Sequence, residues 1–192
     1  MGLLDVIMGR RKLARPAPDR LFAISTAYVK FETELGVISG GSAAIVFQPL
    51  STADFASIVS EMEQVVRETG SESGVTVDSS DDPYGFRWLV LRGKADSFDD
   101  LVVGINAVGG ALEAGGYGDR ILCAVFAFED AQKRPLYLIY NYKRGSFYPF
   151  IPGGGEQQRD TERELRLKAQ LAHELPIEAE LERWFPLWGI PI

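Results

Sequence analysis

The residue types that most often do chemistry in proteins are scarce in this chain. Its 192 residues include one histidine, His173, and one cysteine, Cys123. A structural zinc site takes about four ligands, mostly Cys and His, so these two residues cannot supply one. Cys123 stands inside the apolar run ILCAVFAF, where we expect a buried, inert thiol. His173 stands late in a charged helix, where a partly charged imidazole suits the helix dipole. A Cys–His dyad brought together by the fold is the alternative.

Carboxylates and glycines also favour structural roles. The adjacent pairs Asp81-Asp82 and Asp99-Asp100 stand at predicted turns or helix starts, where carboxylates cap backbone amides. Three glycines at 153–155 precede a predicted helix, but the phosphate-binding pattern GxxxxGK[ST] is absent. We therefore assign no catalytic residue, no metal and no cofactor, and predict a protein that is not an enzyme.

Residues 136–152, LYLIYNYKRGSFYPFIP, depart furthest from average composition. The first half predicts a strand, and aromatic residues flank Pro149 in the second half, which predicts a stiff loop. Aromatic rings of this kind are common at protein interfaces, and the core of the domain is their other usual place. With the tryptophans of the C-terminal tail, they give the candidates for partner binding: Tyr140, Tyr142, Lys143, Arg144, Phe147, Tyr148, Phe150, Trp184 and Trp188.

The N-terminal segment is a second candidate for interaction. It predicts a short helix with one apolar face, followed by a basic cluster and by the stiff, Pro-containing linker ARPAP at 14–18. An amphipathic helix that ends in basic residues can lie on an anionic membrane, and packing against the domain is equally expected. The candidates for membrane contact are Leu3, Leu4, Ile7, Met8, Arg10, Arg11 and Lys12.

Helical periodicity predicts four helices, which must position the candidate residues named above. The clearest pattern runs from Phe55 to Val66, with Ser51 or Thr52 as the expected N-cap and Gly70 as the expected end. The predicted helices cover residues 21–35, 53–69, 98–114 and 160–175.

Apolar runs and turn signals predict the strands. The run 121–128 is apolar on both faces, as a central strand would be, and a polar turn joins it to the next strand as a hairpin. The sequence SSDDP at 79–83 predicts another turn. The segment 37–47 is interrupted by glycines and ends in the strand-like run AAIVFQ. The other predicted strands cover residues 74–78, 86–92, 121–128 and 136–142.

These elements predict an α+β fold with a mostly antiparallel sheet covered by helices. The order of elements is similar to that of the type III secretion chaperone-like fold. We expect residues 1–18 to form the N-terminal helix and linker. Residues 19–192 should form a single domain that ends in a Trp- and Pro-rich tail.

Charge and hydropathy limit the classes of partner and the cellular location that we expect. The net charge is −7; residues 1–20 hold five basic and two acidic residues, so the remainder carries −10. An acidic domain is a poor partner for nucleic acid. No apolar run approaches the roughly 18 residues that cross a bilayer, and no signal-peptide pattern is present. A lone cysteine fits a reducing compartment. We expect a cytoplasmic protein, with attachment to the inner face of the membrane as an option.

The chain resembles the PspAB family, the phage-shock-protein-A-associated proteins of actinobacteria and some archaea. Five segments carry the resemblance, in one order along nearly the whole chain: MGLLDVIMGRRK, PDRLFAIS, YGFRWLVLR, YNYKRGSFYPFIP and ELERWFPLWGIP. The resemblance implies a role in envelope stress, alongside the PspA system and HtpX-type membrane proteases. It carries over no catalytic residue.

Three classes of function compete. The favoured one is a non-catalytic accessory protein of the phage-shock stress response that binds a PspA-like coiled coil or an HtpX-like membrane protease. The alternative is a chaperone-like or small-ligand-binding module that forms a homodimer. The third is an enzyme in which Lys143, Arg144 and acidic residues converge in a cleft.

Overall fold

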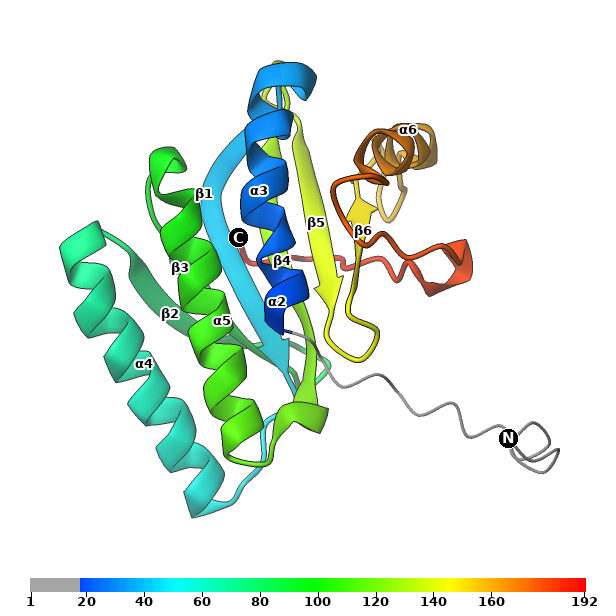
Figure 1. Cartoon of the computed structure of the whole chain (residues 1–192). Helices are drawn as coiled ribbons and strands as arrows, with labels where there is room; N and C mark the ends of the chain where they lie inside the picture. Colours follow the sequence, from blue (N-terminus) through cyan, green and yellow to red (C-terminus); the bar gives the residue numbers. More distant parts are fainter. Residues whose placement is uncertain (1–17) are drawn as a thin grey trace, which may run out of the picture.

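The computed structural model describes residues 18–192 and contains one six-stranded sheet (Figure 1). The strands lie in the order β2-β3-β1-β4-β5-β6, and every neighbouring pair is antiparallel. The predicted α+β class with an antiparallel sheet is therefore confirmed. The strands are β1 Ile38–Phe47, β2 Thr76–Asp81, β3 Arg87–Arg92, β4 Ile121–Glu129, β5 Pro135–Asn141 and β6 Ser146–Phe150.

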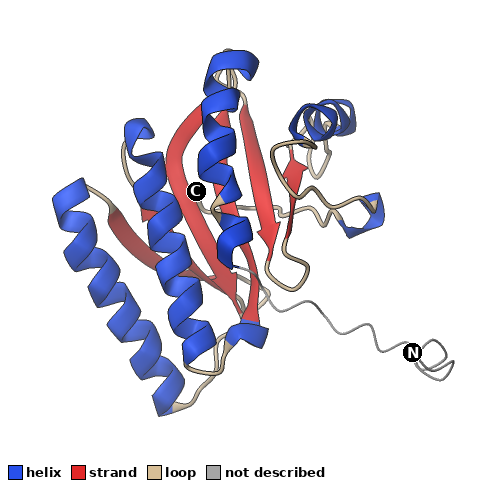
Figure 2. Cartoon of the chain, viewed as in Figure 1, coloured by secondary structure: helices blue, strands red, loops and turns tan. Residues whose placement is uncertain are grey.

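Helices cover one face of this sheet, and Figure 2 shows them as a layer in front of the strands. Helix α5 lies over β1, β3 and β4, with α4 on one side of it and α3 on the other (Figure 1). Helix α6 packs against the edge strand β6. The helices are α2 Pro18–Leu21, α3 Ala23–Lys30, which a π-helical turn at Phe31–Leu35 extends, α4 Ala53–Ser73, α5 Phe98–Ala114 and α6 Thr161–Leu171.

The main core lies between the helices and the sheet. Two glycines bring α5 close to the strands: a Cβ on Gly104 would stand 2.3 Å from Leu91 Cδ2, and one on Gly109 would stand 2.7 Å from the Tyr142 hydroxyl. Helix α5 contributes six buried apolar side chains to this core: Phe98, Leu101, Val102, Ile105, Val108 and Leu112.

A second core lies on the opposite face of the sheet, under the C-terminal tail. Side chains of β1, β3 and β4, among them Val46, Trp88 and Val125, pack there. Trp184 is buried among them, and Leu187 and Trp188 pack over them. Both faces of the sheet are therefore covered, which explains why β4 is apolar on both sides.

The predicted stiff loop around Pro149 is wrong, because residues 146–150 form strand β6. Its pairing with β5 places Phe147 opposite Tyr140 and Pro149 opposite Leu138. Gly145, at φ +64°, closes the turn between the two strands. A proline is tolerated here because β6 is the last strand of the sheet. The sequence indicated a loop because Pro149 makes the segment stiff, and the extended conformation that goes with it also suits an edge strand.

Several predicted boundaries also move. Helix α4 continues beyond Gly70 to Ser73 and is followed by Gly74 at φ +76°. Strand β2 reaches Asp81, so the turn there is shorter than the sequence SSDDP indicated. Helix α6 ends at Leu171, which leaves His173 outside it. In each case sheet pairing or packing extended or shortened an element that local sequence alone had bounded.

Candidate functional site

Six of the nine predicted partner-binding residues lie in the interior. Each is no more than 5% exposed: Tyr140, Tyr142, Phe147, Tyr148, Phe150 and Trp184. Alternation along β5 and β6 sends some of these rings into the main core and others into the second core. In their present positions they close the fold, and they offer no surface to a partner.

The other three residues of that set have different surroundings. Lys143 is exposed in the β5–β6 turn, and Trp188 is half-buried, with its ring centroid 5.0 Å from that of Phe150. The Arg144 guanidinium pairs with the buried carboxylate of Glu178. Arg144 therefore meets an acidic group in a structural ion pair, whereas Lys143 is exposed, and the two basic side chains do not share that partner. Their partner-binding role remains a prediction.

Buried ion pairs hold the C-terminal part of the domain. Burial alone would raise the pKa of Glu178. The hydrogen bond from the Glu180 N–H and the adjacent Arg144 guanidinium outweigh burial, and the pKa is lowered. Nearby, the Glu164 carboxylate is 1% exposed and accepts hydrogen bonds from the Ile151 N–H and the Arg159 guanidinium. Sequence reasoning did not single out these pairs, because their partners come from different elements.

The residues with nucleophilic potential are not activated. Burial raises the pKa of the Cys123 thiol to about 12, so it stays protonated at neutral pH. His173 is exposed, beyond the end of α6. Within residues 18–192, no cluster of three or more His, Cys, Asp or Glu side chains could hold a metal ion.

The seven predicted membrane-contact residues precede Pro18 and lie outside the described residues. Their role at a membrane is still a prediction. Among the described helices, none has the length and apolar character needed to cross a bilayer.

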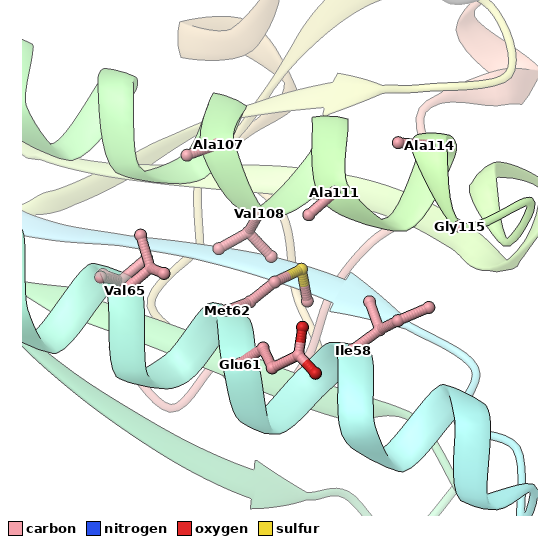
Figure 3. Close-up of a pocket in the computed structure, with 10 residues that line it drawn as sticks. Ile58, Glu61, Met62, Val65, Ala107, Val108, Ala111, Ala114 and Gly115 are labelled. Carbon is pink, nitrogen blue, oxygen red and sulfur yellow. The ribbon is translucent and has the colours of Figure 1, made fainter.

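A groove between α4 and α5 is the candidate site, because its lining is the most apolar of the three hollows described. It encloses about 350 Å³, and its lining is mostly apolar. Figure 3 shows Ile58 and Met62 extending from α4 toward α5, with Val108 and Ala111 facing them. Met62 and Val108 are buried and form its floor, whereas Val65 at one wall is 53% exposed. A solvent-open apolar depression of this kind is where a partner side chain gains most from burial.

Two features of the sequence build this groove. On α4 the apolar stripe is wider than the sheet needs: Phe55 and Val59 are buried, while Ile58 and Val65 turn toward the groove. On α5 the facing residues are small, which keeps that wall low; they are Ala107, Ala111, Ala114 and Gly115. The apolar stripe from Phe55 to Val66 served only to predict a helix, and the site was missed. The excess width of the stripe was the available signal.

The two helices that form the groove are acidic. Glu61 lines it and extends over the gap in Figure 3. Helices α4 and α5 together hold eight acidic residues and one basic residue, Arg67. Cations would accumulate along this face, since a surface of one sign raises the local concentration of the other.

Two other hollows are less suited to a partner. One lies between the β2–β3 turn and the tail, where Asp81 pairs with Arg87 at 2.7 Å. The other lies beside α6, where Asp130 pairs with Arg163 at 2.8 Å. Charged side chains in both are already satisfied by neighbours, so their contacts serve the fold.

The residues described form an α+β domain with an apolar groove between α4 and α5. Over its whole length, residues 1–192, the chain matches the family model PspA associated protein B, PspAB, and it belongs to that family. The family name indicates an association with PspA. No curated protein and no solved structure matches the chain.

Proposed function

We propose that this protein is a non-catalytic accessory protein of the PspA-linked envelope stress response. It acts in the cytoplasm, near the membrane, by binding a helix of a PspA-like coiled-coil protein. The observation that carries this proposal is the apolar groove between α4 and α5, bounded by acidic residues. Family membership supports PspA as the partner.

The chemistry of the groove specifies the kind of helix. Its volume of about 350 Å³ accommodates a few apolar side chains, such as those that an amphipathic helix presents at intervals of three and four residues. Glu61 and the other carboxylates of α4 and α5 favour a helix whose flanking residues are Lys or Arg. An HtpX-like membrane protease is the other partner considered, and it would use the same groove through a helix of the same chemistry.

The test is calorimetric binding of the full chain to a purified PspA-like protein. Ala107→Glu places a bulky, charged side chain at the groove, and we expect it to weaken binding at least about tenfold. The matched control is Ala169→Glu, which makes the same change at an exposed position of α6 and should leave the affinity unchanged.

Two results would contradict the proposal. One is the absence of binding between the unmodified chain and both PspA-like and HtpX-like proteins. The other is equal weakening by Ala107→Glu and Ala169→Glu when circular dichroism shows both variants folded. Binding that only Ala107→Glu weakens supports the groove as the site.

A further inference from the structure

We infer that the N-terminal segment, residues 1–17, occupies the groove between α4 and α5 in the free protein. A partner helix must then displace it. The docking itself stands on the groove and the sequence, and only the displacement rests on the proposed function. The binding is intramolecular: residues 1–17 bind the apolar groove of the same chain.

Chemical fit is the first argument. The groove requires apolar side chains flanked by positive charge. The segment supplies both, since Leu3, Leu4, Ile7 and Met8 are followed by the basic run at 10–12. Residues 1–17 carry four basic residues against Asp5, a net charge of +3, and α4 and α5 carry eight acidic residues against one basic residue. No other stretch of this acidic chain combines apolar residues at helical spacing with such a run of positive charge.

Reach is the second argument. The description of the chain begins at Pro18 in α2, which packs against α5, and α4 flanks the other side of α5 (Figure 1). Neighbouring helices lie about 8–10 Å apart. The five residues 13–17, extended, span up to roughly 17 Å. The linker is therefore long enough to carry the helix across α5 to the groove.

The surface that the segment must cross is the third argument. Beyond Asp99 and Asp100 at its start, the exposed residues of α5 are small or apolar, including Ala107, Gly110 and Ala114, and Glu113 is half-buried. Space around Gly110 is open, because a Cβ added there would meet no atom within 4 Å. Val103, on the same helix, is 57% exposed. These small side chains let a chain pass closely over α5.

Paramagnetic broadening in the full chain tests the docking directly. In the helix that the sequence predicts for this segment, a nitroxide at Gly9→Cys would lie opposite Leu3, Leu4, Ile7 and Met8, by the repeat of 3.6 residues. Cys123 is buried with a pKa of about 12, so the label goes selectively to position 9. We expect strong broadening of the Ile58 and Met62 methyl signals relative to the reduced, diamagnetic sample.

Matched variants identify the contact. Ile7→Glu puts a charge on the apolar face and should abolish the broadening. Val6→Glu makes the same change on the opposite face and should preserve it. Broadening that Ile7→Glu does not remove, broadening centred on other residues, or none at all would overturn the inference.

Two further samples separate the other occupants. Isotope-labelled chain without nitroxide, mixed with unlabelled chain that bears it, should show no broadening. Broadening in that mixture would assign the groove to a second copy and overturn docking in cis. A segment that leaves the groove methyls unaffected in solution but binds phosphatidylglycerol vesicles, and not phosphatidylcholine vesicles, would be a membrane anchor instead.

The regulatory consequence has its own readout. If the segment competes with the partner, Ile7→Glu should increase the affinity for the PspA-like protein several-fold, and Val6→Glu should not. If the spin-labelled chain shows the methyl broadening but Ile7→Glu does not increase the affinity, displacement by the partner is overturned and docking of the segment stands. Absence of any PspA-like partner would contradict the proposed function alone.

Discussion

Charged side chains act together with apolar ones to attach the C-terminal part of this domain to the sheet. Arg159 is the centre of this arrangement, since its guanidinium reaches the Glu164 carboxylate and donates to the backbone oxygens of Trp184 and Pro149. One side chain therefore joins β6, α6 and the tail. Such a group is stable in the interior only while its counter-charge is present.

Removal of that counter-charge gives the first prediction. Glu164→Gln leaves the Arg159 guanidinium without its partner, and we expect the free energy of unfolding to fall by about 3–5 kcal/mol. Urea denaturation measures this loss. Glu162→Gln is the control, because Glu162 is exposed and pairs with Arg166 at the surface, where such pairs contribute roughly 0–1 kcal/mol. Equal losses in the two variants would refute the role given to Arg159.

The second prediction concerns pH and Glu178. Its pKa lies below the ordinary value in the folded protein, because hydrogen bonds and Arg144 outweigh burial. A lowered folded pKa means that the stabilising effect is complete above the unfolded pKa, about 4.3, and is lost as pH falls through the folded value. The urea midpoint should therefore drop more steeply below pH 4.3 for the unmodified chain than for Glu178→Gln. Parallel pH profiles would be inconsistent with this linkage.

At the scale of elements, glycines set the distance between α5 and the strands. Helix α5 carries adjacent glycines with opposite surroundings. Gly109 faces the sheet, where an added Cβ would meet the Tyr142 ring, whereas Gly110 faces open space. Glycine lowers helix stability by roughly 0.5–1 kcal/mol relative to alanine. At Gly109, close packing against the sheet offsets this cost.

This contrast gives the third prediction, with opposite signs at neighbouring positions. Gly110→Ala should stabilise the protein by about 0.5–1 kcal/mol through helix propensity. Gly109→Ala should destabilise it by about 1–3 kcal/mol, because the Tyr142 ring is buried and must move. Thermal denaturation of the two variants decides, and Tyr142→Phe should recover part of the Gly109→Ala loss. Stabilisation by both alanines would show that α5 is not held close by Gly109.

At the scale of the whole molecule, two cores share one sheet. The main core lies under the helices and the second core under the tail, and β1, β3 and β4 contribute side chains to both. Neither core can lose its packing without disturbing strands that the other requires. The described domain is therefore expected to unfold as one cooperative unit.

The fourth prediction follows from this shared sheet. Tryptophan fluorescence reports on Trp88, Trp184 and Trp188, which all belong to the second core, and far-ultraviolet circular dichroism reports mainly on the helices of the other face. The two urea transitions should coincide. Trp184→Ala should shift both to lower urea together, with a loss of about 3–5 kcal/mol. A fluorescence transition that precedes the loss of helix would show that the tail detaches independently.

Local patterns determined much of this protein. The periodicity from Phe55 to Val66, the doubly apolar run of β4 and the turn after it specify helix, central strand and hairpin, since each depends on neighbours along the chain. The scarcity of His and Cys is likewise a property of the sequence alone.

Only the tertiary structure decided where the aromatic residues and the groove lie. Phe147 to Phe150 became a buried edge strand because β5 offered backbone partners and two cores took the rings, and no local pattern reports either. The groove likewise requires the surplus apolar face of α4 beside the small residues of α5, two segments far apart in the chain. Burial is a property of the assembled layers, so the sequence supplied candidate side chains, and packing selected which of them remain at the surface.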